Sequence, residues 1–158
     1  FSIAENLILG IHHRSNWRVS GSAFLDWKRI YSFAKERIKQ FDIRAPSART
    51  KIRHLSGGNV QKVIVAREIS KEPEVIIAAQ PTRGLDVGVI EYVHQRLMEM
   101  RNNGKGVLLI SSDLDEILTL SDRIAVIFEG QIVAIEDPRK TNETRLGLLM
   151  AGHINGGK

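Results

Sequence analysis

Two short apolar runs separated by a stretch with helical periodicity constrain the fold of this chain more than any other feature. Residues 75–79 and 107–110 are continuous apolar segments of strand length, a pattern typical of strands buried in a parallel sheet. Between them, apolar residues recur at helical spacing over 87–103, and Gly104 follows where a helix C-terminal glycine belongs. A strand–helix–strand unit of this kind requires parallel strands joined by a right-handed crossover. The sequence therefore predicts an α/β fold.

Apolar periodicity and capping residues predict the remaining elements. We expect helices that begin at the capping box of Ser2 and Glu5, span 24–41, run from the cap Ser56 to residue 71, and cover 113–120 and 142–150. Strands are expected at 124–128 and 131–135, joined through Glu129-Gly130, which is a hairpin signal. The small, polar tail 151–158 is expected to fray.

Charge is unevenly distributed along the chain and narrows the functional classes. Residues 1–70 hold 13 Lys and Arg against 5 Asp and Glu, a net +8, whereas residues 71–158 hold 10 against 13, a net −3. The basic half suits phosphates or acidic headgroups, or it is simply a solvated surface. Nucleic-acid binding is not expected, because the sequence does not show the aromatic interleaving that is typical of a nucleic-acid-binding platform. The absence of cysteine excludes disulfides and thiolate metal sites.

The segment Ser56-Gly57-Gly58 is the first candidate binding site. Uncovered backbone N–H groups at the positive end of a helix attract anions, and glycine lets a phosphate approach without a Cβ clash. The structural alternative is a Ser-capped helix whose first turn happens to be rich in glycine. Taken alone, the three residues do not decide between these interpretations.

The order of motifs along the chain resembles an ABC ATPase. The segments that carry the likeness are Leu55-Ser56-Gly57-Gly58-Asn59-Val60-Gln61-Lys62, Gln80-Pro81-Thr82-Arg83-Gly84-Leu85-Asp86, Ser111-Ser112-Asp113 and Leu120-Ser121-Asp122-Arg123-Ile124. The chain is most similar to the second ATP-binding half of tandem ATPases of ribose-, simple-sugar- and nucleoside-type importers. The resemblance implies an ABC helical (signature) subdomain over 1–70, the C-terminal portion of a P-loop NTPase (RecA-like) core over 71–135, including the hairpin, and a C-terminal helix with a flexible tail over 136–158.

The resemblance also implies roles for individual residues. Two ATP-binding halves meet head to tail in this family, so the signature residues would contact ATP held by the other half: Ser56, Gly57, Gly58, Asn59 and Gln61. The loop that crosses the dimer interface, the D-loop, would be Gly84, Leu85 and Asp86. The structural alternative for Asp86 is an N-cap of the helix over 87–103, and both roles are compatible.

Departures from the family pattern affect the site that this half would form for its own nucleotide. No G-x-x-x-x-G-K-[ST] loop occurs, so the resemblance implies a chain that begins after the phosphate-binding (Walker A) loop and the glutamine loop. Ala79 stands where the family has the Walker B aspartate, Gln80 where it has the catalytic glutamate, and Ser112 where it has the switch histidine. Alanine has no oxygen for Mg²⁺, and an amide is a poor general base. No intact catalytic residue and no metal site are expected, and the chain alone is expected to be inactive.

The expected function is that of an ABC importer segment that supplies its signature in trans for sugar or nucleoside uptake. ATP and Mg²⁺ would be bound mainly by the other half. Expected partners are that half, membrane permease subunits and, indirectly, a solute-binding protein, at the cytoplasmic face of the inner membrane. The alternative is a non-catalytic structural or regulatory half that only dimerises. A DNA-maintenance ATPase is a weaker rival, since the long coiled-coil heptads of that class are absent from this sequence.

Other polar residues are weaker candidates. His12 and His13 lack a nearby carboxylate or cysteine at ligand spacing, and His54 is expected in a solvated basic turn. Asp113, Asp115 and Glu116 form an acidic helix start that complements the helix dipole. Paired-carboxylate chemistry is the alternative for these three, but no partner acid or base accompanies them.

Overall fold

The computed structural model describes residues 1–20 and 22–153, which divide into two compact units. The first unit contains Phe1–Ile76 and Gly84–Gly106, and the second contains Ile77–Arg83 and the chain from Val107 onward. The expected fraying of the tail concerns residues that lie mostly outside the described part. The boundaries expected after residues 70 and 135 remain predictions.

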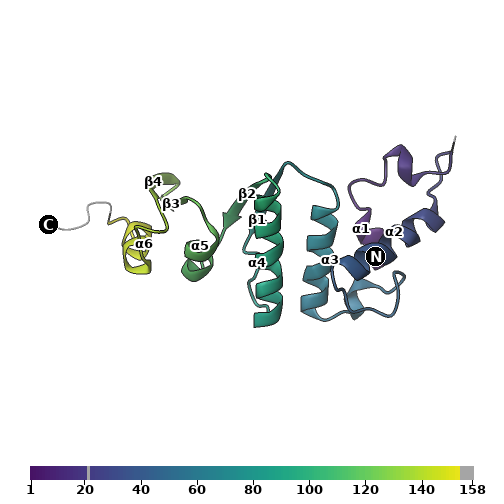
Figure 1. Ribbon diagram of the computed structural model, residues 1–158, viewed down its shortest axis with the longest axis horizontal. Coiled ribbons are helices and arrows are strands. Elements are labelled where there is room, and N and C mark those ends of the chain that lie inside the picture. The colour runs from purple at the N-terminus through teal and green to yellow at the C-terminus, as the bar shows by residue number, and fades with distance from the viewer. Residues whose placement is uncertain (21, 154–158) are drawn as a thin grey trace. The chain divides into compact units, whose positions relative to one another are not determined.

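The first unit is helical. Its helices are α1 (Ile3–Leu7), α2 (Trp27–Gln40), α3 (Gly57–Ile69) and α4 (Val87–Asn102), and two short 3₁₀ turns lie at Ser15–Trp17 and Ile52–His54. Helices α1, α2 and α3 gather around one apolar core (Figure 1), whose fully buried members include Ile3, Leu7, Ile30, Ala34, Phe41, Val63 and Ala66. This core fixes the start of α3, where the first candidate site lies.

The capping box predicted at Ser2 is confirmed. The Ser2 backbone N–H donates to Glu5 Oε2 at 2.5 Å, and the Glu5 N–H donates back to Ser2 Oγ at 3.3 Å. The hydrogen bond from the Ser2 backbone holds the pKa of Glu5 below its usual value. The next residues of α1 donate to carbonyls of the approaching loop, Ile3 to Thr50 and Ala4 to Ala48. Helix α1 therefore anchors the irregular segment that leads into the first candidate site.

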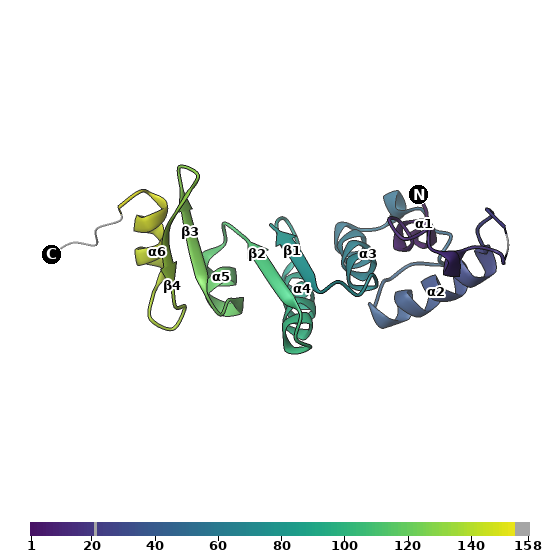
Figure 2. The same ribbon diagram turned by 90° about the horizontal axis from the view of Figure 1, so that it is seen from above.

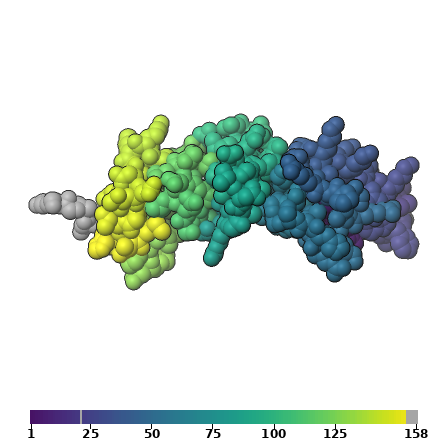
Figure 3. Space-filling model, turned by 90° about the horizontal axis from the view of Figure 1, so that it is seen from below, coloured from purple at the N-terminus to yellow at the C-terminus, as the bar shows by residue number. Residues whose placement is uncertain are grey.

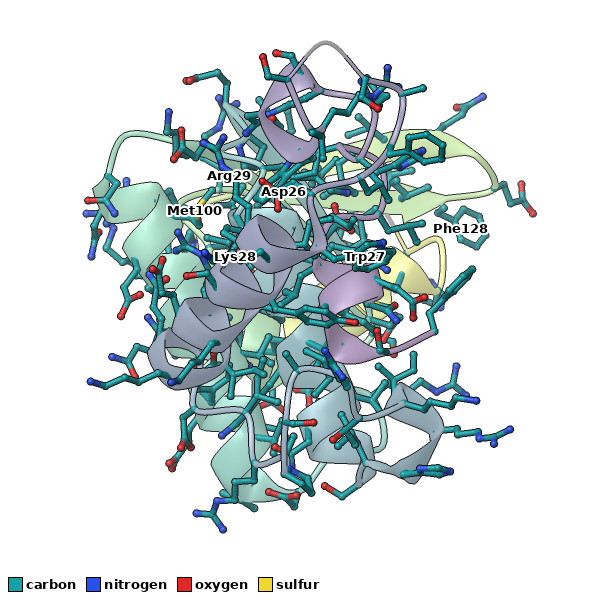
Figure 4. All side chains as sticks on the ribbon, turned by 90° about the vertical axis from the view of Figure 1, so that its right-hand side faces the viewer. Asp26, Trp27, Lys28, Arg29, Met100 and Phe128 are labelled. Atoms are coloured by element: carbon teal, nitrogen blue, oxygen red, sulfur yellow. The ribbon has the colours of Figure 1, made fainter. Side chains whose placement is uncertain are left out.

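Helix α2 begins later than predicted. Asp26 caps the helix, because its Oδ1 accepts the Arg29 N–H at 3.1 Å, and the two residues lie at the start of the helix in Figure 4. The preceding residues form an antiparallel bridge between Arg18 and Leu25 instead of a helical turn. Phe24, the first residue of the expected helix, is 79% exposed. The expected start at residue 24 is therefore wrong.

The predicted strand pair is confirmed as β1 (Val75–Ala79) and β2 (Gly106–Ile110), joined through α4. The Gly106 N–H donates to Glu74 O at the start of the two strands, and the Gln80 N–H donates to Ile110 O at their end. Residue numbers therefore rise in the same direction along both strands, so the pair is parallel. Gly104 has φ +77°, which ends α4 as predicted. The expected burial is wrong for one face, because alternate residues such as Ile77 (65%) and Leu108 (51%) are exposed. Within the described chain no layer covers that face.

The second unit contains the predicted C-terminal elements. They are α5 (Leu114–Leu120), β3 (Ile124–Phe128), β4 (Gln131–Glu136) and α6 (Glu143–Met150), and β3 pairs antiparallel with β4. Both turn residues, Glu129 and Gly130, have positive φ, as a tight two-residue hairpin turn requires. Helix α6 packs on β3 through Leu146 and Leu149, and Figures 2 and 3 show α6 (yellow) against the hairpin.

No described helix combines the length and the apolar character that a membrane-spanning segment needs.

Candidate functional site

The start of α3 carries the signature-like segment, and Ser56 occupies its N-cap position with extended backbone angles. The predicted side-chain cap is not formed. Ser56 Oγ instead accepts a hydrogen bond from Asn59 Nδ2 at 2.9 Å. The first intrahelical bond is made by the Val60 N–H to the Ser56 carbonyl. The first backbone N–H groups of a helix have no intrahelical acceptor, so this end of α3 is chemically suited to an anion.

Asn59 connects two segments of the chain. While its Nδ2 donates to Ser56, its Oδ1 accepts the backbone N–H of Arg44 at 2.7 Å. The side chain therefore ties the irregular segment before the second 3₁₀ turn to the start of α3. These contacts give Asn59 a structural role beside the nucleotide contact that its motif position predicts. Gln61 lies half-buried in the second turn of the same helix.

The two signature glycines have different surroundings. A Cβ atom placed on Gly57 would meet no atom within 4 Å, so the space in front of this residue is open. A Cβ on Gly58 would lie 2.6 Å from Val89 Cγ2, which real packing does not allow. Gly58 therefore permits the close approach of α3 to α4, whereas Gly57 has no such packing reason to be glycine.

Asp86 stands beside Gly58 at the start of α4. Its Oδ1 accepts the Val89 N–H at 3.1 Å, which confirms the predicted N-cap, and its Oδ2 lies 3.7 Å from the Cβ position of Gly58. Gly84 has φ +74°, a conformation that favours glycine, and Leu85 is half-buried. Asp86, one of the three residues expected to form the D-loop, therefore lies beside the signature-like segment within the first unit.

Replacing Asp86 by alanine is expected to lower the free energy of unfolding by about 1 kcal/mol, because the α4 N–H groups lose their side-chain acceptor. Urea unfolding of the chain measures this change. Asp86→Asn keeps a capping oxygen and should retain most of the stability. An equal loss in both variants would contradict a capping role.

Lys62 is also part of the signature segment, and the structure engages it within the chain. Its Nζ donates to Asp42 Oδ2 at 2.7 Å and to the Asp42 carbonyl at 2.9 Å, and it lies 4.8 Å from the ring centroid of Tyr92. The hydrogen bond from Lys62 holds the pKa of the Asp42 carboxyl below its usual value. Asp42 lies beyond the end of α2 and has a left-handed backbone conformation (φ 47°). Its pairing with Lys62 was not predicted from the sequence. Lys62 therefore connects the segment after α2 to α3 through these two hydrogen bonds.

The three positions that depart from the family pattern lie at the C-terminal ends of β1 and β2, in the second unit. Ala79 is the last residue of β1 and is exposed, as is Gln80, which follows it with φ 48°. Ser112 Oγ donates to Gln80 Oε1 at 3.3 Å. The structure thus brings Gln80 and Ser112 together through one hydrogen bond between their side chains. Ala79 contributes no side-chain oxygen that could support Mg²⁺, and the Gln80 amide carries no negative charge.

A buried polar pair lies next to these residues, and sequence reasoning missed it. Thr82 Oγ1 donates to Glu116 Oε1 at 2.9 Å, and both residues are less than a tenth exposed. Asp113 caps α5 by accepting the Glu116 N–H at 3.1 Å, whereas Asp115 is exposed. The acidic helix start therefore divides into a cap, a surface residue and a buried anchor.

The three histidines considered as candidates are exposed. The rings of His12 and His13 meet edge to face at 5.8 Å, and His54 Nε2 accepts from Arg53 Nε at 3.2 Å. Over residues 1–20 and 22–153, no group of three or more His, Cys, Asp and Glu side chains is arranged to hold a metal ion.

Comparison with curated proteins finds relatives along almost the whole chain. The guanosine import ATP-binding protein NupO of Bacillus subtilis is 51% identical over 152 residues, which cover 96% of this chain and 29% of that protein. The nucleoside import ATP-binding protein NupA of Lactococcus lactis is 49% identical over 151 residues, with the same coverage. The ribose import ATP-binding protein RbsA of Bacillus subtilis is 38% identical, covering 96% of this chain and 30% of that protein. The chain thus spans less than a third of the length of these relatives. No family model matches it.

Two solved structures of ABC proteins are similar in fold to this chain. A dimeric ATP-binding cassette in a post-hydrolysis state, bound to ADP and Pi, is 27% identical with a TM-score of 0.69, covering 89% of this chain and 58% of that one. A metal-chelate type ABC transporter in an inward-facing conformation has a TM-score of 0.74 at 16% identity, covering 96% of this chain and 58% of that one. The second likeness concerns the fold alone.

Proposed function

Because this chain belongs, as a segment, to the ATP-binding proteins of ABC importers, we propose that it supplies the signature side of an ATP site in trans. The ATP would be held by the other ATP-binding half of a longer protein, of which this chain is a part. The observation that carries the proposal is the open space in front of Gly57, at the uncapped N-terminus of α3. A terminal phosphate fits there, because uncovered backbone N–H groups and the helix dipole both favour an anion.

The proposal assigns a different state to the site that this half would form for its own nucleotide. That site is catalytically silent, since Ala79 has no carboxylate to support Mg²⁺ and Gln80 cannot act as a general base. The hydrogen bond between Ser112 and Gln80 supports this assignment, because it pairs the two side chains with each other. The other half would therefore supply most of the ATP and Mg²⁺ binding.

The solute of the longer protein is proposed from its relatives. The nucleoside and guanosine import proteins are 49–51% identical to this chain, whereas the ribose import protein is 38% identical. We therefore favour nucleoside uptake over ribose uptake. Permease subunits and, indirectly, a solute-binding protein would be the partners, and the segment would work at the cytoplasmic face of the membrane.

An ATPase assay of the longer protein tests the proposal through two substitutions. Replacing Gln80 by glutamate is expected to leave the rate within about twofold, because a general base alone does not restore a site that lacks a Mg²⁺-supporting carboxylate. Replacing Gly57 by glutamate should lower the rate about 100-fold or more. An increase on Gln80→Glu would show that the site is active after all.

The alternative function is a half that only dimerises. It predicts that ATP hydrolysis is unaffected when Gly57 is replaced, so the same assay separates the two functions. The open approach to Gly57 favours the catalytic role, since no packing contact requires a glycine at that position.

A further inference from the structure

Two hydrogen bonds connect the loop after β1 with the start of α5. The outer bond joins Gln80 and Ser112, and both residues are exposed. The inner bond joins Thr82 and Glu116, which are 8% and 3% exposed. The two bonds link the same two segments, because Thr82 lies two residues after Gln80 and Glu116 lies four residues after Ser112.

The inner bond is the stronger of the two. Its oxygens are 2.9 Å apart in a buried setting, where a charged or polar group gains most from a partner and loses most without one. The outer bond, at 3.3 Å, is long for a hydroxyl donor and is open to water. The outer bond is therefore too weak to hold the loop by itself.

Gln80 needs support from its neighbours. Its φ of 48° lies in the left-handed region, which is unfavourable for a side chain of this size. On one side, its backbone N–H donates to the Ile110 carbonyl at 2.7 Å. On the other side, Pro81 restricts the backbone between Gln80 and Thr82. A shift of Thr82 would therefore change the backbone conformation of Gln80.

We propose that Glu116 is a positioning residue that, through Thr82, holds Gln80 against Ser112. This inference rests on the proposed function, which places Gln80 and Ser112 at the site for this half's own nucleotide. Glu116 is itself held at the start of α5, where its backbone N–H donates to Asp113. In this proposal Glu116 and Thr82 maintain the catalytically silent state of the site, because they keep Gln80 and Ser112 hydrogen-bonded to one another.

Disulfide trapping in this 158-residue chain tests the inference, because the sequence contains no cysteine. The reporter is the double variant Gln80→Cys/Ser112→Cys under a mild oxidant. Thr82→Val removes the donor hydroxyl at nearly the same size and is expected to slow trapping at least about fivefold. Thr82→Ser keeps the hydroxyl and should restore the rate. Glu116→Ala provides a second way to remove the bond and should match Thr82→Val.

The control pair is Ala125→Cys/Ile135→Cys, whose positions are register partners in the hairpin of the same unit. Thr82→Val should leave trapping of this pair unchanged, and circular dichroism at the assay temperature checks that each variant is folded. Equal slowing of both pairs would mean general loosening and would overturn the inference. So would an unchanged reporter rate, a failure of serine to rescue it, or no trapping before Thr82 is changed. No nucleotide is involved, so these outcomes are independent of the ATPase assays.

Discussion

Replacing Gly57 by glutamate is expected to lower ATP hydrolysis by the longer protein about 100-fold or more, the scale seen when donors aimed at a developing negative charge are lost. The carboxylate would occupy the open space in front of α3, where the proposal puts the terminal phosphate of ATP. Like charges would then face each other at the helix terminus. Steady-state hydrolysis at saturating ATP measures the effect.

The matched control for this prediction is Gly147→Glu. Gly147 is also an exposed helical glycine with no atom within 4 Å of its Cβ position, but it lies in α6, outside the signature. It should change neither hydrolysis nor stability. Gly57→Glu should likewise leave the unfolding transition in place, since it creates no clash. Full activity of Gly57→Glu would leave the structural-half function as the better account.

Gly58→Ala is expected to destabilise the chain by about 1–3 kcal/mol, because its methyl group would overlap Val89 Cγ2 and force α3 away from α4. Thermal or urea unfolding of the chain measures the loss. Gly57→Ala is the matched control and should be neutral or slightly stabilising, since alanine favours the helix and meets no atom.

The double variant Gly58→Ala/Val89→Ala makes the origin of this loss testable. Removing the Val89 methyl groups should make the effect of Gly58→Ala much smaller, as a coupling in a double-mutant cycle. Additive losses would contradict the proposed overlap. The contact also means that activity lost on substitution of Gly58 mixes packing with catalysis, which makes Gly57 the better probe of phosphate contact.

Local signals in the sequence predicted much of the fold. Ser2 with Glu5, Asp86, Asp113 and Asn142 mark helix starts because a side-chain oxygen satisfies an N–H three residues on, which is visible in sequence. Gly104 and the Glu129-Gly130 turn are likewise local. Local signals misplaced the start of α2, because the bridge between Arg18 and Leu25 competes with an extra helical turn.

Contacts between distant segments could not be predicted. The pairs Thr82–Glu116, Lys62–Asp42 and Asn59–Arg44 are separated by 34, 20 and 15 residues, and no local pattern indicates that they meet. Motif positions identified Gln80 and Ser112 separately, but their hydrogen bond depends on the parallel pairing of β1 and β2. Strand burial was overestimated for a related reason, since an apolar run does not reveal whether a layer covers each face of its sheet.

The most direct test of trans function is the labelling rate of Gly57→Cys in the longer protein by a thiol reagent, with and without MgATP. If Gly57 contacts ATP in trans, MgATP slows labelling, and this protection disappears when the phosphate-binding lysine of the other half is replaced. Gly147→Cys should be labelled at the same rate in every condition. Protection that is absent, or that depends on the phosphate-binding loop of this half instead, would contradict the central claim.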